Sequence, residues 1–256
     1  DDISTHVRDP KILEHDGIYY MVLGARTKDD RGCVLVYTSH DLECWKYATR
    51  IELGEKFGFM WECPDLFELD GELILVCCPQ GVPADGWRYQ NPHQCVWFRI
   101  EADWEAPSFK IAGQGMPPMV DAGLDFYAPQ SFADADGRRI MIGWAGCPDA
   151  TAQNPTVERG WQCALTVPRV LNMRDGKLCQ WPAREVEQLR KERVSVTAGE
   201  TVGSPGRLFD AVVSCRGTKS IELEVREGVV VCFANGMLTL DMGDEGYGRD
   251  KRSVEL

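Results

Sequence analysis

The pattern of apolar and polar positions predicts strands along most of the chain and a helix almost nowhere. Short apolar runs, some alternating with polar residues, favour strands over residues 19–23, 34–37, 73–76, 139–142, 221–225 and 229–231. Tight hairpin turns are indicated by Asp-Gly or Asn-Gly pairs at 16–17, 70–71, 136–137, 175–176 and 235–236. A helical pattern is confined to residues 183–193, a densely charged segment. We therefore expect an all-β protein.

The strands and turns recur as a repeat. Three stretches each contain a proline, an apolar strand, an Asp-Gly turn six or seven residues after the proline, and a second apolar strand. The prolines are Pro10, Pro64 and Pro129, which lie 54 and 65 residues apart, enough for four short strands each. Four-stranded sheets repeated in this way are the blades of a β-propeller. We expect about three blades over residues 1–192 and, from the alternation over 219–242, part of a β-sandwich over 193–256.

Composition narrows the choice of partners and compartment. The net charge of −12 argues against nucleic acid, which is bound by Lys and Arg. The apolar runs fall well short of the roughly 18 residues of a membrane helix, so no membrane partner is expected. The 11 cysteines are odd in number and include no Cys-x-x-Cys pair, which favours a reducing cytoplasm. The 4 histidines lack ligand spacing, and we expect neither a metal nor a cofactor.

Polar residues stand at the start of each repeat, where the innermost strand of a blade faces the propeller axis. Asp9, Glu62 and Tyr127 precede the three repeated prolines by one or two positions. Arg8 neighbours Asp9 and favours its charged form, whereas the apolar residues at 60–61 favour a protonated Glu62. One charged and one protonated carboxyl group are what glycosidic cleavage requires. The alternative is that Asp9 and Glu62 are carboxylates of a turn and of the surface.

Several ordered motifs run through residues 1–193 at compatible spacing, among them Arg8-Asp9-Pro10, Trp61-Glu62-Cys63-Pro64-Asp65, Asp125-Phe126-Tyr127-Ala128-Pro129-Gln130 and Ile142-Gly143-Trp144. Together they resemble glycoside hydrolase family 32, the β-fructofuranosidases, and in particular its sucrose-6-phosphate hydrolases and sucrases. The resemblance is dense over residues 1–193 and weak beyond them.

The resemblance implies a five-bladed β-propeller followed by a C-terminal β-sandwich. It implies a retaining, metal-free hydrolase of terminal β-D-fructofuranosides such as sucrose or sucrose 6-phosphate. By motif, Glu62 is implied as the general acid/base and Asp9 as the stabiliser of the transition state. The residues implied to bind or surround the sugar are Arg8, Cys63, Tyr127, Trp144, Asp121 and Gln130. A fructan hydrolase or fructosyltransferase of the same fold, and a non-catalytic sugar-binding propeller, stay open as alternatives.

One departure concerns the nucleophile. The family resembled here carries it as the Asp of Trp-Met-Asn-Asp-Pro-Asn-Gly, and no Asn-Asp-Pro occurs in this sequence. We therefore expect two further blades before the first residue and closing sandwich strands after the last, with the fragment inactive by itself. Asp16 and Asp65 are weak candidates to replace the nucleophile, because both are expected deeper along their blades. A small sugar is the expected partner, and a homo-oligomer is left open.

Overall fold

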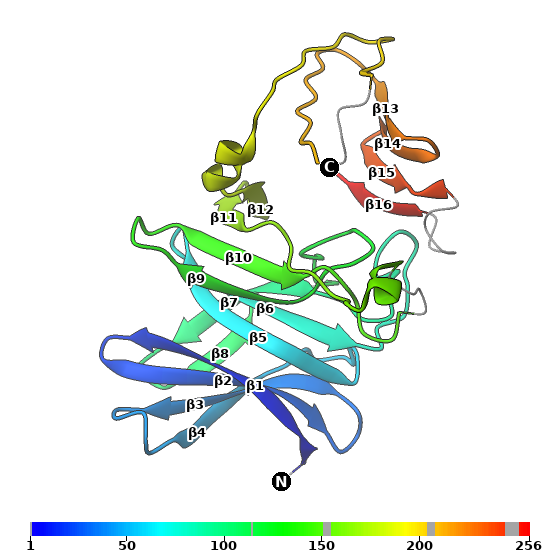
Figure 1. Ribbon diagram of the computed structural model, residues 1–256. Helices are drawn as coiled ribbons and strands as arrows, with labels where there is room; N and C mark the ends of the chain where they lie inside the picture. The colour runs from blue at the N-terminus through cyan, green and yellow to red at the C-terminus, as the bar shows by residue number, and fades with distance from the viewer. Residues whose placement is uncertain (1, 114, 151–154, 204–207, 244–250) are drawn as a thin grey trace.

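The computed structural model describes residues 2–113, 115–150, 155–203, 208–243 and 251–256, so Asp1 lies outside the described residues. These residues form four antiparallel sheets of four strands each, with two short 3₁₀ helices (Figure 1). The all-β prediction is confirmed.

The first three sheets are consecutive meanders, and each starts with a strand that carries a repeated proline. The first sheet consists of β1 (Ile3–His15), β2 (Ile18–Thr27), β3 (Gly32–Ser39) and β4 (Lys46–Ile51). The second consists of β5 (Met60–Leu69), β6 (Glu72–Gln80), β7 (Val96–Asp103) and β8 (Ser108–Ile111). The third consists of β9 (Tyr127–Ala133), β10 (Arg139–Trp144), β11 (Arg169–Arg174) and β12 (Lys177–Pro182). Three consecutive four-stranded meanders are the arrangement expected of propeller blades, while a ring of five blades stays a prediction.

The sheets pack face to face through apolar clusters. The first cluster joins the first two sheets and includes Val22, Val36, Trp61, Leu75 and Phe98. The second joins the second and third sheets and includes Phe67, Val76, Trp97, Tyr127 and Met141. Glycines allow the first two sheets to approach closely, since a Cβ at Gly24 would collide with the carbonyl oxygen of Trp61. Trp61 therefore fixes where β5 lies against β2.

The three innermost strands share one backbone irregularity. Asp9, Cys63 and Ala128 each precede a proline and have φ of 63°, 49° and 48°. The ladders to β2, β6 and β10 change register at the same three places, which marks β-bulges. Positive φ is uncommon for residues other than glycine, and the residue before a proline normally has an extended backbone. The repeat is therefore a repeat of a strained bulge as well as of a turn.

This bulge corrects the alignment of the repeats. Because Asp9 and Cys63 occupy the same position in it, the residue equivalent to Glu62 and Tyr127 is Arg8. The alignment of the three repeats by sequence puts Asp9 at this position, one residue too far along, because it matches the carboxyl group of Asp9 with that of Glu62.

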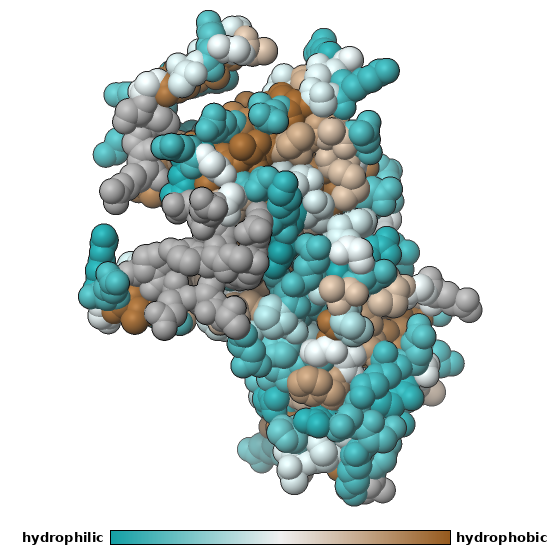
Figure 2. Space-filling view, turned by 90° about the vertical axis from the view of Figure 1, so that its right-hand side faces the viewer, coloured by the Kyte–Doolittle hydropathy of each residue, from teal (hydrophilic) through white to brown (hydrophobic). Residues whose placement is uncertain are grey.

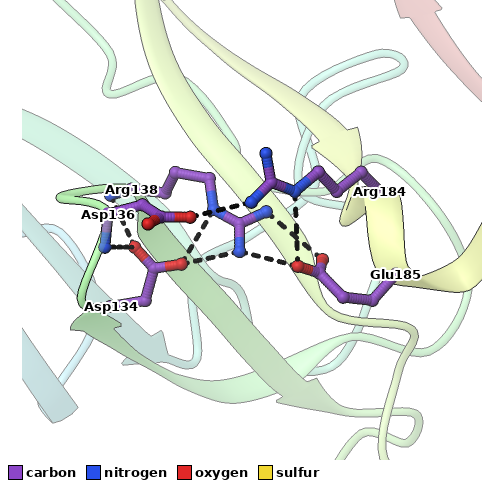
Figure 3. A network of polar contacts seen from close by, with 5 residues as sticks. All are labelled: Asp134, Asp136, Arg138, Arg184 and Glu185. Atoms are coloured by element: carbon purple, nitrogen blue, oxygen red, sulfur yellow. Dashed lines mark hydrogen bonds and ion pairs between the residues drawn. The ribbon is translucent and has the colours of Figure 1, made fainter.

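The third sheet continues into the 3₁₀ helix η2 (Arg184–Leu189), and η1 (Pro155–Arg159) lies between β10 and β11. The helix predicted over 183–193 is therefore shorter and tighter, without a capping side chain or a buried residue. Ion pairs hold it instead: the Arg138 guanidinium bridges Asp134 on the β9–β10 turn and Glu185, and Arg184 contacts Asp136 (Figure 3).

The last sheet consists of β13 (Ser220–Arg226), β14 (Val229–Ala234), β15 (Met237–Asp241) and β16 (Lys251–Glu255). Its strands are mostly half-exposed, and among their described residues only Val229 is buried. Figure 2 shows apolar surface gathered at the level of this sheet, above a mainly hydrophilic lower part. The Arg252 side chain of β16 donates to the Asn91 Oδ1 atom, at 2.9 Å from Nη2, in the β6–β7 connection. The sandwich over residues 193–256 stays a prediction, and the described residues of that range contribute one four-stranded sheet.

Within the described part of the chain, the helical segments are all too short or too polar to cross a lipid bilayer.

Candidate active site

Side chains from three sheets meet at Glu62. The Arg8 Nε atom donates to Glu62 Oε1 at 2.8 Å, and the Tyr127 hydroxyl donates to Glu62 Oε2 at 2.8 Å. Arg8, Glu62 and Tyr127 occupy the equivalent position on β1, β5 and β9, and we call them the upper tier. The Glu62 side chain is 16 % exposed and that of Arg8 is 36 % exposed. Both carboxylate oxygens accept hydrogen bonds, which is the pattern of an ionised group.

These contacts correct two expectations. Arg8 points its guanidinium at Glu62, so its expected pairing with the adjacent Asp9 is wrong. Trp61 was expected to give Glu62 an apolar setting, yet its indole faces the opposite side, stacks on Phe98 and donates to the Phe57 carbonyl oxygen. Trp61 and Glu62 are neighbours along β5 and point to opposite faces, as side chains of a strand do, so adjacency in sequence does not bring the indole to the carboxylate.

Asp9 joins the first two sheets beside the upper tier. Its Oδ2 atom accepts from the Cys63 backbone N–H at 2.9 Å, and the Cys63 Sγ atom lies 3.5 Å away. Burial, followed by the neighbouring Cys78, Asp9 and Glu62, raises the pKa of the Cys63 thiol. Cys63 is therefore held as a neutral thiol between two carboxylates.

Tyr127 is buried in the same way. Burial, then Cys78 and Glu62, raises the pKa of its phenol, so that it persists as a hydrogen-bond donor. Trp144 on β10 is its ladder neighbour. The Trp144 indole N–H is buried and has no hydrogen-bond partner among the described residues.

Two further predicted residues lie less centrally. Gln130 is exposed, and its Nε2 atom donates to the Cys63 carbonyl oxygen at 3.4 Å. Asp121 instead pairs with Arg169 at 2.7 Å and accepts from the Gly123 N–H at 2.7 Å. Asp121 is thus tied to β11 through Arg169, whereas Glu62 is held by Arg8 and Tyr127.

The two weak candidates for a nucleophile occupy contrasting places. Asp65 is fully buried and bound to Lys11 and Ser131, which leaves it no access to a substrate. Asp16 lies in the β1–β2 turn with its side chain 92 % exposed. Both therefore lie away from the upper tier, as the sequence predicted.

His93 is the nearby residue that the sequence reading missed. Treated there as a surface or turn residue, it is buried, with its ring centroid 6.2 Å from that of Tyr127. Its Nδ1 atom accepts from the Gly81 N–H, so the proton lies on Nε2, which contacts Asp149 Oδ2 at 2.9 Å. An isolated histidine in a loop carries no sequence signal of such an arrangement.

The arrangement is suited to moving one proton. A carboxyl group held between a cation and a neutral phenol, with a second carboxylate nearby, has the elements of general acid/base catalysis. Within the described residues, no cluster of three or more His, Cys, Asp or Glu side chains could hold a metal ion.

Comparisons with known proteins agree on one family. A family model described as "Glycosyl hydrolases family 32 N-terminal domain" matches residues 1–182. The sucrose-6-phosphate hydrolase of Salmonella typhimurium is 37% identical over 256 residues, covering 97% of this chain and 52% of that protein. A probable sucrose-6-phosphate hydrolase of Vibrio cholerae is 40% identical, covering 99% of this chain and 45% of its own length. The chain spans about half the length of the curated relatives that it matches.

Solved structures agree with the sequence matches. The sucrose-6-phosphate hydrolase of Lactobacillus gasseri superposes with a TM-score of 0.79 at 26% identity, covering 100% of this chain and 56% of that chain. A Bombyx mori β-fructofuranosidase gives a TM-score of 0.76 at 28% identity, covering 98% and 54%. A variant of the Bombyx mori enzyme has been solved in complex with sucrose.

Proposed function

We propose that the protein is a β-fructofuranosidase, because the chain belongs to glycoside hydrolase family 32. Its reaction is the retaining hydrolysis of terminal β-D-fructofuranosides, with sucrose or sucrose 6-phosphate as substrate. The observation that carries this proposal is the hydrogen-bonded upper tier, in which Arg8 and Tyr127 hold the two oxygens of Glu62.

Glu62 is the proposed general acid and base. A retaining glycosidase needs a carboxyl group that first protonates the leaving oxygen and later deprotonates the attacking water. In its protonated form Glu62 can keep only one of its two accepting contacts unchanged, because one oxygen then carries the proton. Arg8 is the more exposed of the two partners, so a bound sugar can accept the hydrogen bond that Arg8 otherwise donates to Glu62. The buried Tyr127 keeps its contact with Glu62.

Asp9 is the proposed stabiliser of positive charge in the transition state. Its Oδ2 atom is fixed by Cys63, which orients the carboxylate without neutralising it. Retention also requires an attacking carboxylate. In the family resembled here this group belongs to an Asn-Asp-Pro motif, which the sequence of this chain does not contain.

The remaining candidates surround this centre as substrate-binding residues. The exposed amide of Gln130 is a donor available to sugar hydroxyls, and Trp144 is proposed to line the pocket as the ladder neighbour of Tyr127. Asp121 acts through Arg169 in this proposal. The sucrose complex of the Bombyx mori variant is consistent with a small sugar as partner.

Residues 1–192 are proposed as catalytic propeller and 193–256 as a separate sandwich domain. Support comes from the described part of 190–219, which contains no strand, and from the change of packing beyond it.

The cytoplasm is the proposed compartment. All 11 cysteines of the chain are free thiols, several of them buried, as expected where disulfides do not form.

The deciding experiment is Glu62→Gln in the full-length protein that carries this chain. General acid/base catalysis typically contributes about 10²- to 10⁴-fold, so kcat on sucrose should fall by that amount, with an unchanged circular dichroism spectrum. Glu68→Gln is the matched control, because Glu68 is an exposed glutamate of the same strand. Wild-type turnover by the Glu62 variant would refute the assignment. Parallel product analysis on sucrose, sucrose 6-phosphate and inulin identifies the substrate.

A further inference from the structure

A second set of polar contacts, made by two side chains and one backbone segment, joins the same three strands beyond the prolines. Lys11 on β1, Asp65 on β5 and Ser131 on β9 form this set, which we call the lower tier. The Ser131 N–H donates to Asp65 Oδ2 at 2.6 Å, and the Lys11 ammonium donates to the Ser131 carbonyl oxygen at 2.8 Å. Lys11 Nζ also lies 3.6 Å from Asp65 Oδ1.

Burying the Asp65 carboxylate costs free energy, because the charged group loses its contact with water. Its side chain is fully enclosed, and its Oδ1 atom has no hydrogen-bond partner among the described residues. Burial raises the pKa of Asp65, against the opposing effects of Lys11 and Ser131. Replacing a buried ion pair with apolar residues is often neutral or stabilising. A role in stability alone therefore gives a poor account of this carboxylate.

The two tiers are linked through the bulges. Glu62 lies three residues before Asp65, and Arg8 lies three residues before Lys11. Between them the ladders change register, so the pairing of Lys11 and Asp65 with β2 and β6 is separate from that of Arg8 with Gly24 and of Glu62 with Cys78. Contacts between the sheets on the far side of the bulge add a second constraint on how the three strands lie relative to one another.

We propose that Asp65 is a positioning residue, which sets the relative height of β1, β5 and β9 through Lys11 and Ser131 and so aligns Arg8 and Tyr127 with Glu62. The inference rests on the proposed function, since it gives Asp65 a task in orienting the proposed acid/base.

The test uses Lys11→Met and Asp65→Asn in the full-length protein. Lys11→Met leaves the buried Asp65 carboxylate without its cation, whereas Asp65→Asn removes the buried charge itself, so the two variants disturb the lower tier in different ways and either one that folds tests the inference. A misplacement of about 1 Å can cost about 100-fold in rate, and we expect kcat to fall by that order while KM changes by less than about 3-fold. Lys11→Arg keeps the charge and should restore most of kcat.

Asp134→Asn is the matched control, because Asp134 also binds a cation and a backbone N–H, both of Arg138, on the outer turn in Figure 3. It should lower the melting temperature and leave kcat unchanged. Crystal structures of wild type and Lys11→Met provide a readout independent of activity, in which the variant should lose the Arg8 or the Tyr127 hydrogen bond to Glu62.

An intact upper tier in Lys11→Met, or a folded Asp65→Asn with wild-type kcat, would overturn the inference. If the wild-type enzyme cleaves no fructoside, the proposed function fails, and the crystal structures still decide whether the lower tier positions Glu62.

Discussion

At the scale of single residues, Glu62 is held by side chains from two other sheets and by no neighbour in sequence. The bulges that permit this place Asp9, Cys63 and Ala128 at positive φ, at a cost on the order of 1–3 kcal/mol each. Such strain persists only where packing enforces it, and here it lies beside Glu62, whose two carboxylate oxygens both accept hydrogen bonds from other sheets. The backbone strain and the hydrogen bonds therefore both single out the surroundings of Glu62 as the candidate site.

Tyr127→Phe tests the buried donor. A hydrogen bond to a charged group contributes about 1.5–3 kcal/mol, so the variant should lose roughly 10- to 100-fold in kcat on the proposed substrate. Because burial raises the pKa of Tyr127, the phenol stays protonated and the loss should be equal at mildly acidic and mildly alkaline pH. The kcat–pH profiles of variant and wild type provide the measurement.

Tyr47→Phe is the control for that measurement, since Tyr47 is 56% exposed on β4 and lies edge-on to Tyr37. A Tyr127 variant with the kcat of the wild type would show that the phenol plays no part in the reaction.

At the scale of elements, the site depends on how closely β5 approaches β2. The added Cβ at Gly24 would also lie 3.3 Å from the Cα of Glu62. Neither Trp61 nor Glu62 can shift there without moving the carboxylate relative to Arg8 and Tyr127. A glycine with no chemistry of its own thus becomes part of the geometry of the site.

Gly24→Ala should therefore destabilise the fold by about 1–3 kcal/mol, the usual effect of overpacking, and should lower activity as well. Urea unfolding and turnover are the two measurements. Gly54→Ala is the control, because no atom lies within 4 Å of its added Cβ. Equal stability of the two variants would mean that β2 and β5 separate easily.

The elements were largely predictable from sequence, because Asp-Gly turns and apolar runs are local signals. The site was predictable only in part. Glu62 and Tyr127 were found from the repeat, whereas the partner of Glu62 was not, since Arg8 reaches it across 54 residues. A bulge shifts the alignment of the repeats by one residue, and the amino-acid sequence gives no signal of it. The packing of His93 against Tyr127 depends on tertiary structure alone.

At the scale of the whole molecule, the buried thiols couple stability to pH. Burial raises the pKa of Cys33 to about 11, and it raises those of Cys63, Cys77 and Cys78 from the same ordinary value of 9.0. These thiols favour the native state fully below pH 9. Above it the unfolded chain releases their protons while the native state retains them, so the free energy of unfolding falls.

We expect a fall of about 1.4 kcal/mol per pH unit for each such thiol, beginning near its ordinary pKa. Urea unfolding at a series of alkaline pH values measures this slope. Cys77→Ala should reduce the slope, and Cys44→Ser, at an exposed position, should leave it unchanged. A free energy of unfolding that stays flat across this range would contradict the expectation.

The lower tier has one more consequence. Lys11, Asp65 and Ser131 close the space between the three innermost strands directly beyond Glu62, with Asp65 wholly enclosed. With this space filled, the open side of Glu62 is the side on which the partly exposed Arg8 lies. In the reaction that we propose, substrate and product therefore both pass on the side of Arg8.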